Sequence, residues 1–357
     1  MAANLVRASR LPVITGLQAD LSAIRAAIEL ARIAGAVVDH RSSQAIYPAI
    51  RAIRDCGAFL GAPAEMRRRA DRVLLVGREP FAGDPDLAEF LLKSEPDLGV
   101  RTRGHGRAVV WLGGEPGATL PGAASVEIVE CAEAAIPDVL AMLRAGVAGH
   151  RFGPGPLPAE TIADLADWLK GAGFGCAVFA ATEMDELTAE MLLGLVGDLN
   201  GETRFSTLPV FPGGEAYGAA LAATWSTGFP LRVSFGRGEP EHDPQIFAAE
   251  RLVRSGEADL VVDISTLTTT GPALPDWTRG VPLIALGSAE VVAGLPARVA
   301  FGVGTAGRDH DGVLFNARFG SFAPVSASGE GSGAPSAAAV LHAVSALLLS
   351  AEASAAA

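Results

Sequence analysis

The chain has 357 residues, of which 49% are apolar and 19% charged, so it can bury a sizeable core and is not expected to be disordered. At about 150 residues per domain, this length predicts roughly two domains. The formal net charge of −12 leaves no overall basic footprint, which excludes a typical nucleic-acid-binding protein. The one basic cluster, residues 67–69, is interpreted as the exposed face of a helix.

The three cysteines, Cys56, Cys131 and Cys176, are far apart and form no CxxC pair. This spacing predicts buried structural thiols in a reducing compartment, and no disulfide framework, iron–sulfur cluster or zinc site. Residues 1–16 lack an apolar stretch of signal-peptide length, and the apolar residues 337–351 are too few to span a membrane. We therefore expect a cytoplasmic protein without a membrane partner.

Short apolar runs alternate with segments of helical spacing along the chain. Strands are predicted at residues 11–17, 36–39, 72–77, 107–112, 125–129, 176–181, 260–264, 281–286 and 298–301. Helices are predicted at residues 17–35, 134–147, 162–169, 185–199 (with Thr182 as N-cap), 246–254 and 340–348. The apolar stripe of the last helix must be buried on this chain or on a partner. The alternation predicts an α/β protein with Rossmann-like, doubly wound, mostly parallel sheets.

Three short motifs are candidates for chemistry. Residues 302–307 match GxGxxG after a predicted strand, but a polar turn follows where a dinucleotide site needs a helix, so we predict no nucleotide site. The runs Glu241–Asp243 and Asp309–Asp311 mix histidine with acids. Loops can bend around an ion, so metal binding stays open there, but adjacent residues rarely share a face and we interpret both runs as solvated loops. The residues alone therefore indicate no convincing active site.

Several segments, taken in order, resemble the B-type subunit of formylmethanofuran dehydrogenase: residues 11–17, 36–39, 198–205, 208–213, 223–230 and 254–260. The similarity runs from about residue 10 to about residue 320. It implies two interleaved, doubly wound α/β domains like those of the molybdopterin oxidoreductase (formate dehydrogenase) fold, without the iron–sulfur domain. The resemblance further implies how the segments group. Residues 1–40 would pack with 150–240, residues 41–149 with 241–325, and residues 326–357 would form a linker and a C-terminal helix.

The family carries a cysteine–histidine pair in the loop after its second strand, and that cysteine ligates molybdenum or tungsten. Matching Asp39 and Pro48 to the family pattern puts Ala45 at the cysteine position and Ile46 at the histidine position. Neither side chain has a lone pair to offer a metal, and isoleucine cannot carry a proton. We therefore expect no catalytic residue, no bound cofactor and no metal site in this chain.

Without redox groups, the chain is most similar to the B-type subunit of the formyltransferase/hydrolase complex of methylotrophic bacteria. That resemblance implies a non-catalytic structural subunit, with A-, C- and D-type subunits as partners. Such a complex moves a formyl group from tetrahydromethanopterin to a methanofuran-type carrier and hydrolyses it to formate. One alternative is a redox-active molybdopterin or tungstopterin formylmethanofuran dehydrogenase subunit without a protein thiol ligand. Another is an independent small-molecule-binding protein or transferase that uses the sheet crevice.

Overall fold

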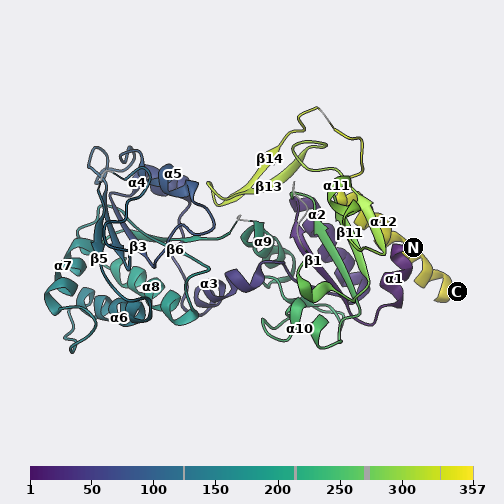
Figure 1. Cartoon of the computed structure of the whole chain (residues 1–357), viewed down its shortest axis with the longest axis horizontal. Coiled ribbons are helices and arrows are strands. Elements are labelled where there is room, and N and C mark those ends of the chain that lie inside the picture. The colour runs from purple at the N-terminus through teal and green to yellow at the C-terminus, as the bar shows by residue number, and fades with distance from the viewer. Residues whose placement is uncertain (124, 213–214, 269–273, 330, 357) are drawn as a thin grey trace. The chain divides into compact units, whose positions relative to one another are not determined.

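The computed structural model describes the chain except for residues 124, 213–214, 269–273, 330 and 357 and the side chains of residues 352–356. The chain forms two compact units. Unit 1 comprises Met1–Ser43, Glu215–Asn316 and Ser321–Ala357, and unit 2 comprises Gln44–Gly214 and Ala317–Gly320. Each unit is a layered α/β structure with its own sheet, as the alternation of apolar runs and helical segments predicts (Figure 1).

Unit 1 is built on a seven-stranded sheet in the order β12-β11-β10-β1-β2-β8-β9. Its strands are β1 (Pro12–Gln18), β2 (Val37–Val38), β8 (Val233–Ser234), β9 (Glu241–His242), β10 (Leu260–Ser265), β11 (Leu283–Gly287) and β12 (Val299–Gly302). The strands from β12 to β2 are parallel, and β8 and β9 are antiparallel to their neighbours. The chain moves outward from β1 to β2 on one side and from β10 to β12 on the other, so the strand order reverses between β1 and β10.

Helices cover both faces of this sheet. The helices of unit 1 are α1 (Ala2–Ala8), α2 (Leu21–Ala34), α9 (Glu215–Thr227), α10 (Ala249–Arg254), α11 (Ala289–Ala293) and α12 (Ala337–Ala356). The unit also contains the 3-10 turn η2 (Asp276–Thr278) and a separate two-stranded hairpin, β13 (Gly312–Asn316) and β14 (Ser321–Val325). Val13, Val37 and Val261 form one apolar cluster with side chains of α10 and α11. Because side chains alternate along a strand, Ile14 and Val38 point to the opposite face, where α2 contacts β1 and β2.

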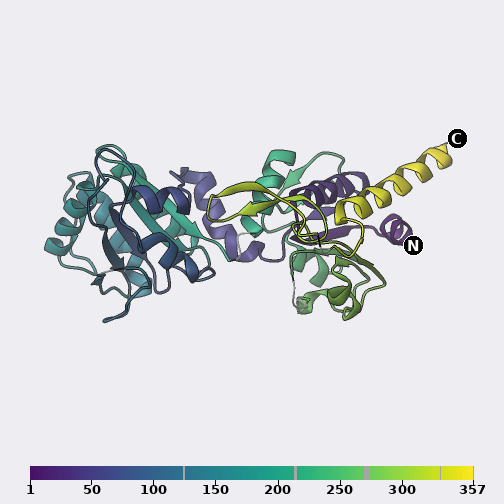
Figure 2. The ribbon, with the colours of Figure 1, turned by 90° about the horizontal axis from the view of Figure 1, so that it is seen from above.

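Helix α12 packs along α2, and this contact buries the predicted apolar stripe on the chain itself. Leu341, Val344 and Leu348 are buried, whereas Leu347 is exposed. The side chain of Arg7 in α1 donates a hydrogen bond to the Leu347 carbonyl at 3.1 Å. The last turns of α12 extend beyond α2 (Figure 2). No described helix combines the length and apolarity needed to cross a bilayer.

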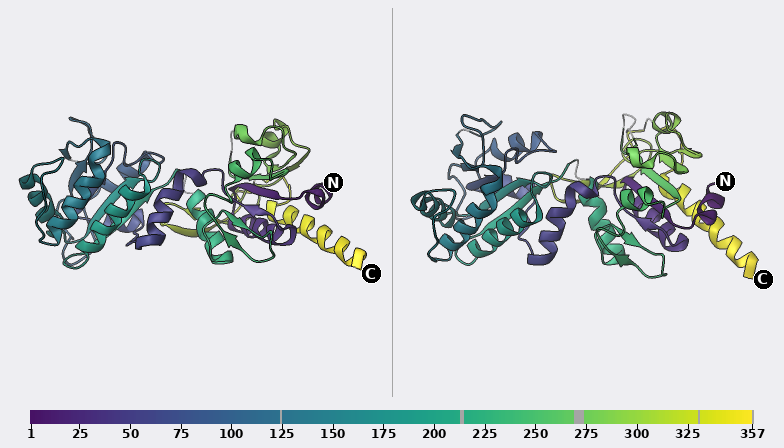
Figure 3. Two further views of the ribbon diagram at one scale, coloured as in Figure 1. Left: turned by 90° about the horizontal axis from the view of Figure 1, so that it is seen from below. Right: turned by 60° about the horizontal axis from the view of Figure 1, so that its bottom comes forward.

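Unit 2 contains a five-stranded parallel sheet in the order β5-β4-β3-β6-β7. Its strands are β3 (Arg72–Val76), β4 (Ala108–Leu112), β5 (Glu127–Val129), β6 (Gly175–Ala180) and β7 (Phe205–Val210). Its helices are α3 (Ser43–Cys56), α4 (Pro63–Arg69), α5 (Asp86–Leu92), α6 (Ile136–Val147), α7 (Ala159–Lys170) and α8 (Glu186–Leu199), with the 3-10 turn η1 (Glu133–Ala135) before α6. Helices α4 and α5 close one apolar core on the sheet. Helices α6, α7 and α8 pack together in this unit (Figure 3).

The helix ends follow local chemistry. Asp20 caps α2 by accepting a hydrogen bond from the Ser22 amide at 3.1 Å, and Gly35 ends the helix in the left-handed conformation that glycine adopts without strain. Helix α8 is capped by Asp185, whose carboxylate accepts from the Thr188 amide at 2.8 Å. The predicted N-cap, Thr182, is therefore wrong, because an aspartate stands directly before the first helical turn.

The predicted grouping of segments into domains is corrected by the strand pairing. Strand β6 pairs with β3 in unit 2, so residues 150–214 join residues 44–149 and not residues 1–40. Strand β10 pairs with β1 in unit 1, so residues 241–316 join residues 1–43 and not residues 44–149. The predicted C-terminal helix is α12, and it packs on α2 within unit 1. The physical reason is that a parallel strand is an apolar run buried on both faces. Its own sequence therefore does not say which sheet it joins.

The cysteines behave differently from one another. Cys176 lies in the apolar core of unit 2, as predicted, and burial raises the pKa of its thiol. Cys56 is exposed and Cys131 is half-buried, so the prediction of buried thiols is wrong for these two. Cys56 is the last residue of α3 and Cys131 lies just beyond β5, where no apolar pattern reports burial.

Asp259 provides a first test of how unit 1 is held together. Its carboxylate accepts hydrogen bonds from the Ser9 hydroxyl at 2.5 Å and from the amides of Arg10 and Leu11 at 3.1 and 3.3 Å. Partial burial raises the pKa of this carboxyl, but the hydrogen bonds outweigh it and lower the pKa to about 2. We expect Asp259→Asn to lower the free energy of unfolding by about 1–2 kcal/mol at pH 7.

A carboxyl with a lowered pKa in the folded state stabilises the protein above the pKa of the unfolded chain, and this stabilisation is lost as the pH falls toward 2. Urea unfolding at pH 7 and at pH 3 should therefore show a smaller difference between wild type and Asp259→Asn at the lower pH. Asp97→Asn, at an exposed ion pair with Arg68, is the matched control and should change little. An equal loss at both pH values would contradict this role for Asp259.

Candidate functional site

Polar side chains gather at the carboxyl edge of the unit 1 sheet, where the strand order reverses. Asp39 directly follows β2, and Asp263 and Ser265 lie near the end of β10, two strands away. All three are buried. Ligands of open α/β sheets bind outside the carboxyl ends of the strands at such a reversal. This buried polar cluster is therefore the candidate functional site.

Asp39 is fully engaged by its surroundings. One carboxylate oxygen accepts from the His40 amide at 2.8 Å and the Ser43 hydroxyl at 2.5 Å. The other accepts from the amide of Ala249, the first residue of α10, at 3.0 Å and lies 3.5 Å from Nε of Arg232. Burial raises the pKa of Asp39, although the nearby Arg232 charge and these hydrogen bonds oppose the rise. Asp39 thus joins β2, the start of α3 and the start of α10.

Arg232 reaches Asp39 through an unusual turn. Leu231 and Arg232 both have positive φ, at 61° and 46°, in the region where residues other than glycine pay a steric cost. The carbonyls of this turn accept from Nδ1 of His242 at 3.0 and 3.2 Å, and the His242 ring stacks on Phe229 with its centroid 5.4 Å away. Nδ1 must carry the proton, because carbonyl oxygens only accept. His242 therefore braces the turn that directs Arg232 into the interior.

The second buried charge pair joins Arg41 and Asp263. Nη2 of Arg41 donates to the Asp263 carboxylate at 2.8 Å and to the Ser265 hydroxyl at 2.9 Å. The Ser265 hydroxyl donates in turn to the other oxygen of Asp263 at 2.8 Å. The side chain of Asp263 is 2% exposed, so an unpaired negative charge there would be costly.

A bulge in β1 makes room for the Asp263 carboxylate. The register between β1 and β10 shifts between Thr15 and Gln18, where Gly16 and Leu17 have positive φ. A Cβ added to Gly16 would lie 2.6 Å from the Ile264 carbonyl oxygen and 2.8 Å from a carboxylate oxygen of Asp263. Only glycine combines this φ with so close an approach.

His40 is buried beside these charges. Its Nδ1 accepts from the Ser42 amide at 2.9 Å, so the neutral ring carries its proton on Nε2. Burial, assisted by the positive charge of Arg41, lowers the pKa of His40 to about 3. Nε2 is buried and has no hydrogen-bond partner among the residues that the structure describes. His40 is thus a neutral donor at physiological pH and not a proton acceptor.

The positions matched to the family's metal ligands lie in the first turn of α3. Ala45 is half-buried and Ile46 is fully buried. Neither offers a donor atom, so this pair of positions has no group that could coordinate an ion or move a proton. The thiol nearest along the chain, Cys56, stands at the other end of α3.

The two histidine–acid runs have structural roles. His242 braces the left-handed turn, as described above. The Asp309 carboxylate accepts from the amides of Ser332 and Thr305 at 2.7 and 2.8 Å, and these bonds lower its pKa. Nδ1 of His310 lies 2.7 Å from the Asp311 carbonyl oxygen. We predicted solvated loops, but Glu241–His242 forms β9 and the Asp309 carboxylate fixes a turn through these hydrogen bonds.

The GxGxxG segment is followed by a turn, as the polar residues after it predict. Residues 302–307 run from the end of β12 into a turn in which the Asp309 amide donates to the Thr305 carbonyl at 2.8 Å. The next element is β13, not a helix. No helix N-terminus therefore follows these described glycines as a phosphate site requires.

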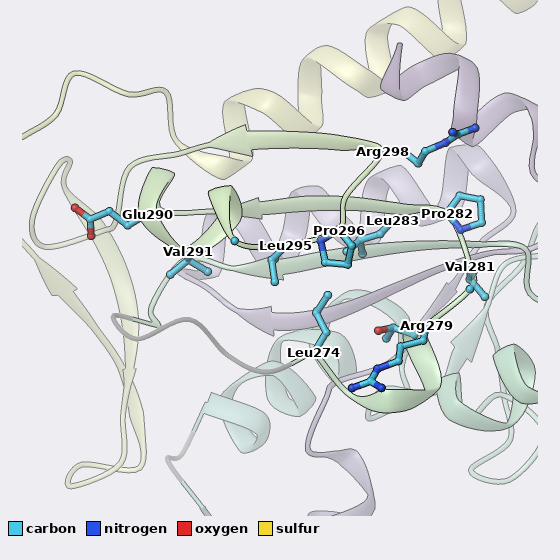
Figure 4. Close-up of a pocket in the computed structure, with 13 residues that line it drawn as sticks. Leu274, Arg279, Val281, Pro282, Leu283, Glu290, Val291, Leu295, Pro296 and Arg298 are labelled. Carbon is cyan, nitrogen blue, oxygen red and sulfur yellow. The ribbon is translucent and has the colours of Figure 1, made fainter.

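A separate hollow lies beside β11 and α11 in unit 1 (Figure 4). Leu274 and Leu295 point toward its middle, whereas Glu290 and Arg298 point away from it. Arg279 pairs with Asp276 at 2.8 Å at the rim. The described lining is thus largely apolar.

One acidic group in unit 2 has metal-like spacing. Asp55, Glu186 and Glu190 place one oxygen each within 4.8 Å of one another. Two of these carboxylates already face arginines, because Arg51 lies 3.2 Å from Glu186 and Arg54 lies 2.7 Å from Asp55. The group lies at the surface, where acidic clusters are common.

Sequence reasoning missed the residues that form the site, namely Arg41, Arg232, Asp263 and Ser265. The sequence contained one indication of the site, because Asp263 and Ser265 interrupt an otherwise apolar strand near its carboxyl end. Burial of a charge there requires a partner. Nothing local identifies that partner, since Arg41 lies 222 positions from Asp263 along the chain.

Comparison with known proteins finds two kinds of relative. The chain is 36% identical over 328 residues to the B-type subunit of the formyltransferase/hydrolase complex Fhc of Methylorubrum extorquens, covering 92% of this chain and 87% of that protein. It is 26% identical over 273 residues to the B-type subunit of the tungsten-containing formylmethanofuran dehydrogenase 2 of Methanocaldococcus jannaschii, covering 74% of this chain and 62% of that protein. These relatives confirm the resemblance to the B-type subunit of formylmethanofuran dehydrogenase.

The fold also matches a solved structure. A chain from the crystal structure of the formyltransferase/hydrolase complex (FhcABCD) of Methylorubrum extorquens with methylofuran superposes with a TM-score of 0.86 at 34% identity. The match covers 98% of this chain and 95% of the other. No protein-family model matches the chain.

Gly16→Ala tests the bulge beside Asp263. The substitution combines the cost of a positive φ with a clash against β10, so we expect unfolding free energy to fall by roughly 2–5 kcal/mol. Gly57→Ala is the matched control, because Gly57 has a φ of 75° and open space around it. It should cost only about 1–2 kcal/mol. Equal urea midpoints for the two variants would contradict the close approach at Gly16.

His40 predicts a pH dependence of stability. The unfolded chain protonates this histidine near pH 6.5, whereas the folded chain does so only near pH 3. Stability should therefore fall as the pH decreases from about 6.5, by about 1 kcal/mol per pH unit. Urea unfolding between about pH 7 and about pH 4.5 should show a weaker pH dependence of stability for His40→Gln than for wild type. His150→Gln, at an exposed position, should behave as wild type.

Proposed function

Since the chain belongs to the family of B-type subunits of formyltransferase/hydrolase complexes, we propose that it is a non-catalytic structural subunit of such a complex. Its partners are A-, C- and D-type subunits in a cytoplasmic assembly. The assembly moves a formyl group from tetrahydromethanopterin to a methanofuran-type carrier and releases it as formate. The chain contributes a scaffold for the subunits that carry out transfer and hydrolysis.

The observation that carries this proposal is the donor set at the matched metal-ligand positions. Ala45 and Ile46 supply neither a thiolate nor an imidazole, and molybdenum and tungsten sites rely on such soft or nitrogen donors. The charged groups at the carboxyl edge of the unit 1 sheet pair with one another, as Arg41 with Asp263 and Arg232 with Asp39. Neither carboxylate of this described cluster is left to act as a base toward a substrate.

The architecture supports a common origin with the molybdopterin oxidoreductases. Unit 1 is assembled from three separate stretches of chain, with unit 2 inserted between them, and each sheet is doubly wound. Interleaved domains of this kind are what the resemblance to the formate dehydrogenase fold implies. We propose that the chain keeps this scaffold and has lost its redox chemistry.

A redox-active tungstopterin or molybdopterin subunit is the second candidate. The tungsten-containing relatives at 26% identity favour it. In that case the pterin itself would hold the ion without a protein thiolate. The two proposals differ in the metal that accompanies the purified protein.

The test is purification of the tagged full chain from its native host, followed by identification of co-purifying chains and elemental analysis. We expect A-, C- and D-type subunits in fixed ratio and far less than one tungsten or molybdenum ion per chain. A tungsten-containing formylmethanofuran dehydrogenase purified in the same way is the positive control for metal retention. Metal in a near one-to-one ratio would overturn the non-catalytic role. A lone monomer would overturn the structural role, and a monomer that binds nucleotide would favour an independent binding protein.

A further inference from the structure

The strand reversal between β1 and β10 is the place where a doubly wound sheet offers a crevice to a ligand. In this chain the side chain of Arg41 lies there. Arg41 follows β2, and its guanidinium reaches Asp263 and Ser265 on β10, so the side chain spans the carboxyl end of the intervening β1. The arginine side chain itself is only 15% exposed.

We propose that Asp263 and Ser265 form a guanidinium-binding site at the strand reversal of unit 1, and that Arg41 of the same chain occupies it and closes the crevice to external ligands. The site is built from buried acceptors. The Asp263 carboxylate is 2% exposed, and the Ser265 hydroxyl accepts from Arg41 while donating to Asp263. Arg41 is the cation that the described residues place on Asp263.

The charge of the site determines which ligands it accepts. A buried carboxylate stabilises a cation and repels phosphate or carboxylate groups, so the site selects a guanidinium or an amine. Doubly wound sheets that bind nucleotides present backbone amides and glycines to phosphate at this place. Here the glycine of the bulge, Gly16, instead lets the Asp263 carboxylate approach the backbone of β1.

The position of Arg41 in the chain gives the site a structural role. Arg41 precedes Ser43, the last residue of the first stretch of unit 1 and the first residue of α3. The Asp39 carboxylate accepts hydrogen bonds from the Ser43 hydroxyl and from the amide of His40. The guanidinium site and Asp39 together therefore hold residues 39–43 against the sheet edge.

The experiment is rescue of an arginine deletion by free guanidinium, read as the melting temperature of the full chain. Arg41→Ala leaves the buried Asp263 charge without a counterion, so the melting temperature should fall by on the order of 10 °C. Guanidinium chloride at low millimolar concentration should restore part of this loss and saturate, whereas sodium chloride at equal concentration should not. Wild type should show no such rise, because Arg41 already fills the site.

Two further variants keep the test decisive. Arg41→Ala combined with Asp263→Asn removes both charges, so it should melt above Arg41→Ala and lose the response to guanidinium. Arg68→Ala is the matched control, because Arg68 pairs with Asp97 at a similar distance of 2.9 Å but both side chains are more than half exposed. It should melt close to wild type and ignore guanidinium.

If Arg41→Ala does not fold alone, refolding from urea with and without millimolar guanidinium measures the same rescue as a recovered fraction of folded protein. The proposal is overturned if Arg41→Ala melts like wild type, or if the double variant responds to guanidinium as strongly as Arg41→Ala does. Neither outcome depends on whether the chain assembles with partner subunits, so failure here is distinguishable from failure of the proposed function.

Discussion

Two carboxylates buried at one edge of a sheet, Asp39 and Asp263, constrain the structure of unit 1 around them. A charge taken out of water is costly unless it is paired and hydrogen-bonded, and breaking such a pair leaves the other charge uncompensated. Arg232 and Arg41 therefore have to reach these carboxylates from other segments of the chain. The strained turn at Arg232 and the bulge at Gly16 are backbone adjustments that allow it.

The pairing of these carboxylates with arginines also limits the chemistry that they can perform. Active sites hold acids and bases whose pKa values suit proton transfer near neutral pH, and those groups face a space that a substrate can enter. In the polar cluster of unit 1 the carboxylates face arginines, and the pKa of His40 lies far below neutrality. Together with Ala45 and Ile46 at the positions matched to the metal ligands, these groups support the proposed structural role.

An element could be predicted from the sequence where its own residues show a clear apolar pattern. Most of the parallel strands were predicted, because each is an apolar run between turn residues. Strand β7 was missed, because Ser206, Thr207 and Pro209 interrupt its apolar residues. Helix α3 was missed because Pro48 lies inside it, and a proline usually indicates a helix break. Helix α9 was missed because its buried residues are almost all alanines, which leave no stripe of large apolar side chains.

The candidate site was harder to predict than the fold. The resemblance places Ala45 and Ile46 at the positions of the metal ligands, and the loss of those ligands stays a prediction. The residues that form the cluster could not be grouped, because a charge in a strand reports that it needs a partner but not where the partner is. His242 shows the same limit, since its partners are carbonyls of a turn about ten residues earlier in the chain.

The sequence by itself determined that this is an α/β chain with doubly wound sheets and which family it resembles. The fold class follows from the spacing of apolar residues, and the resemblance rests on short motifs in their order along the chain; both are local properties. Only the tertiary structure decided which strands share a sheet, placing residues 150–214 with residues 44–149. It alone also paired Arg41 with Asp263, because hydrogen bonds and buried charges act through space between segments that chain position does not relate.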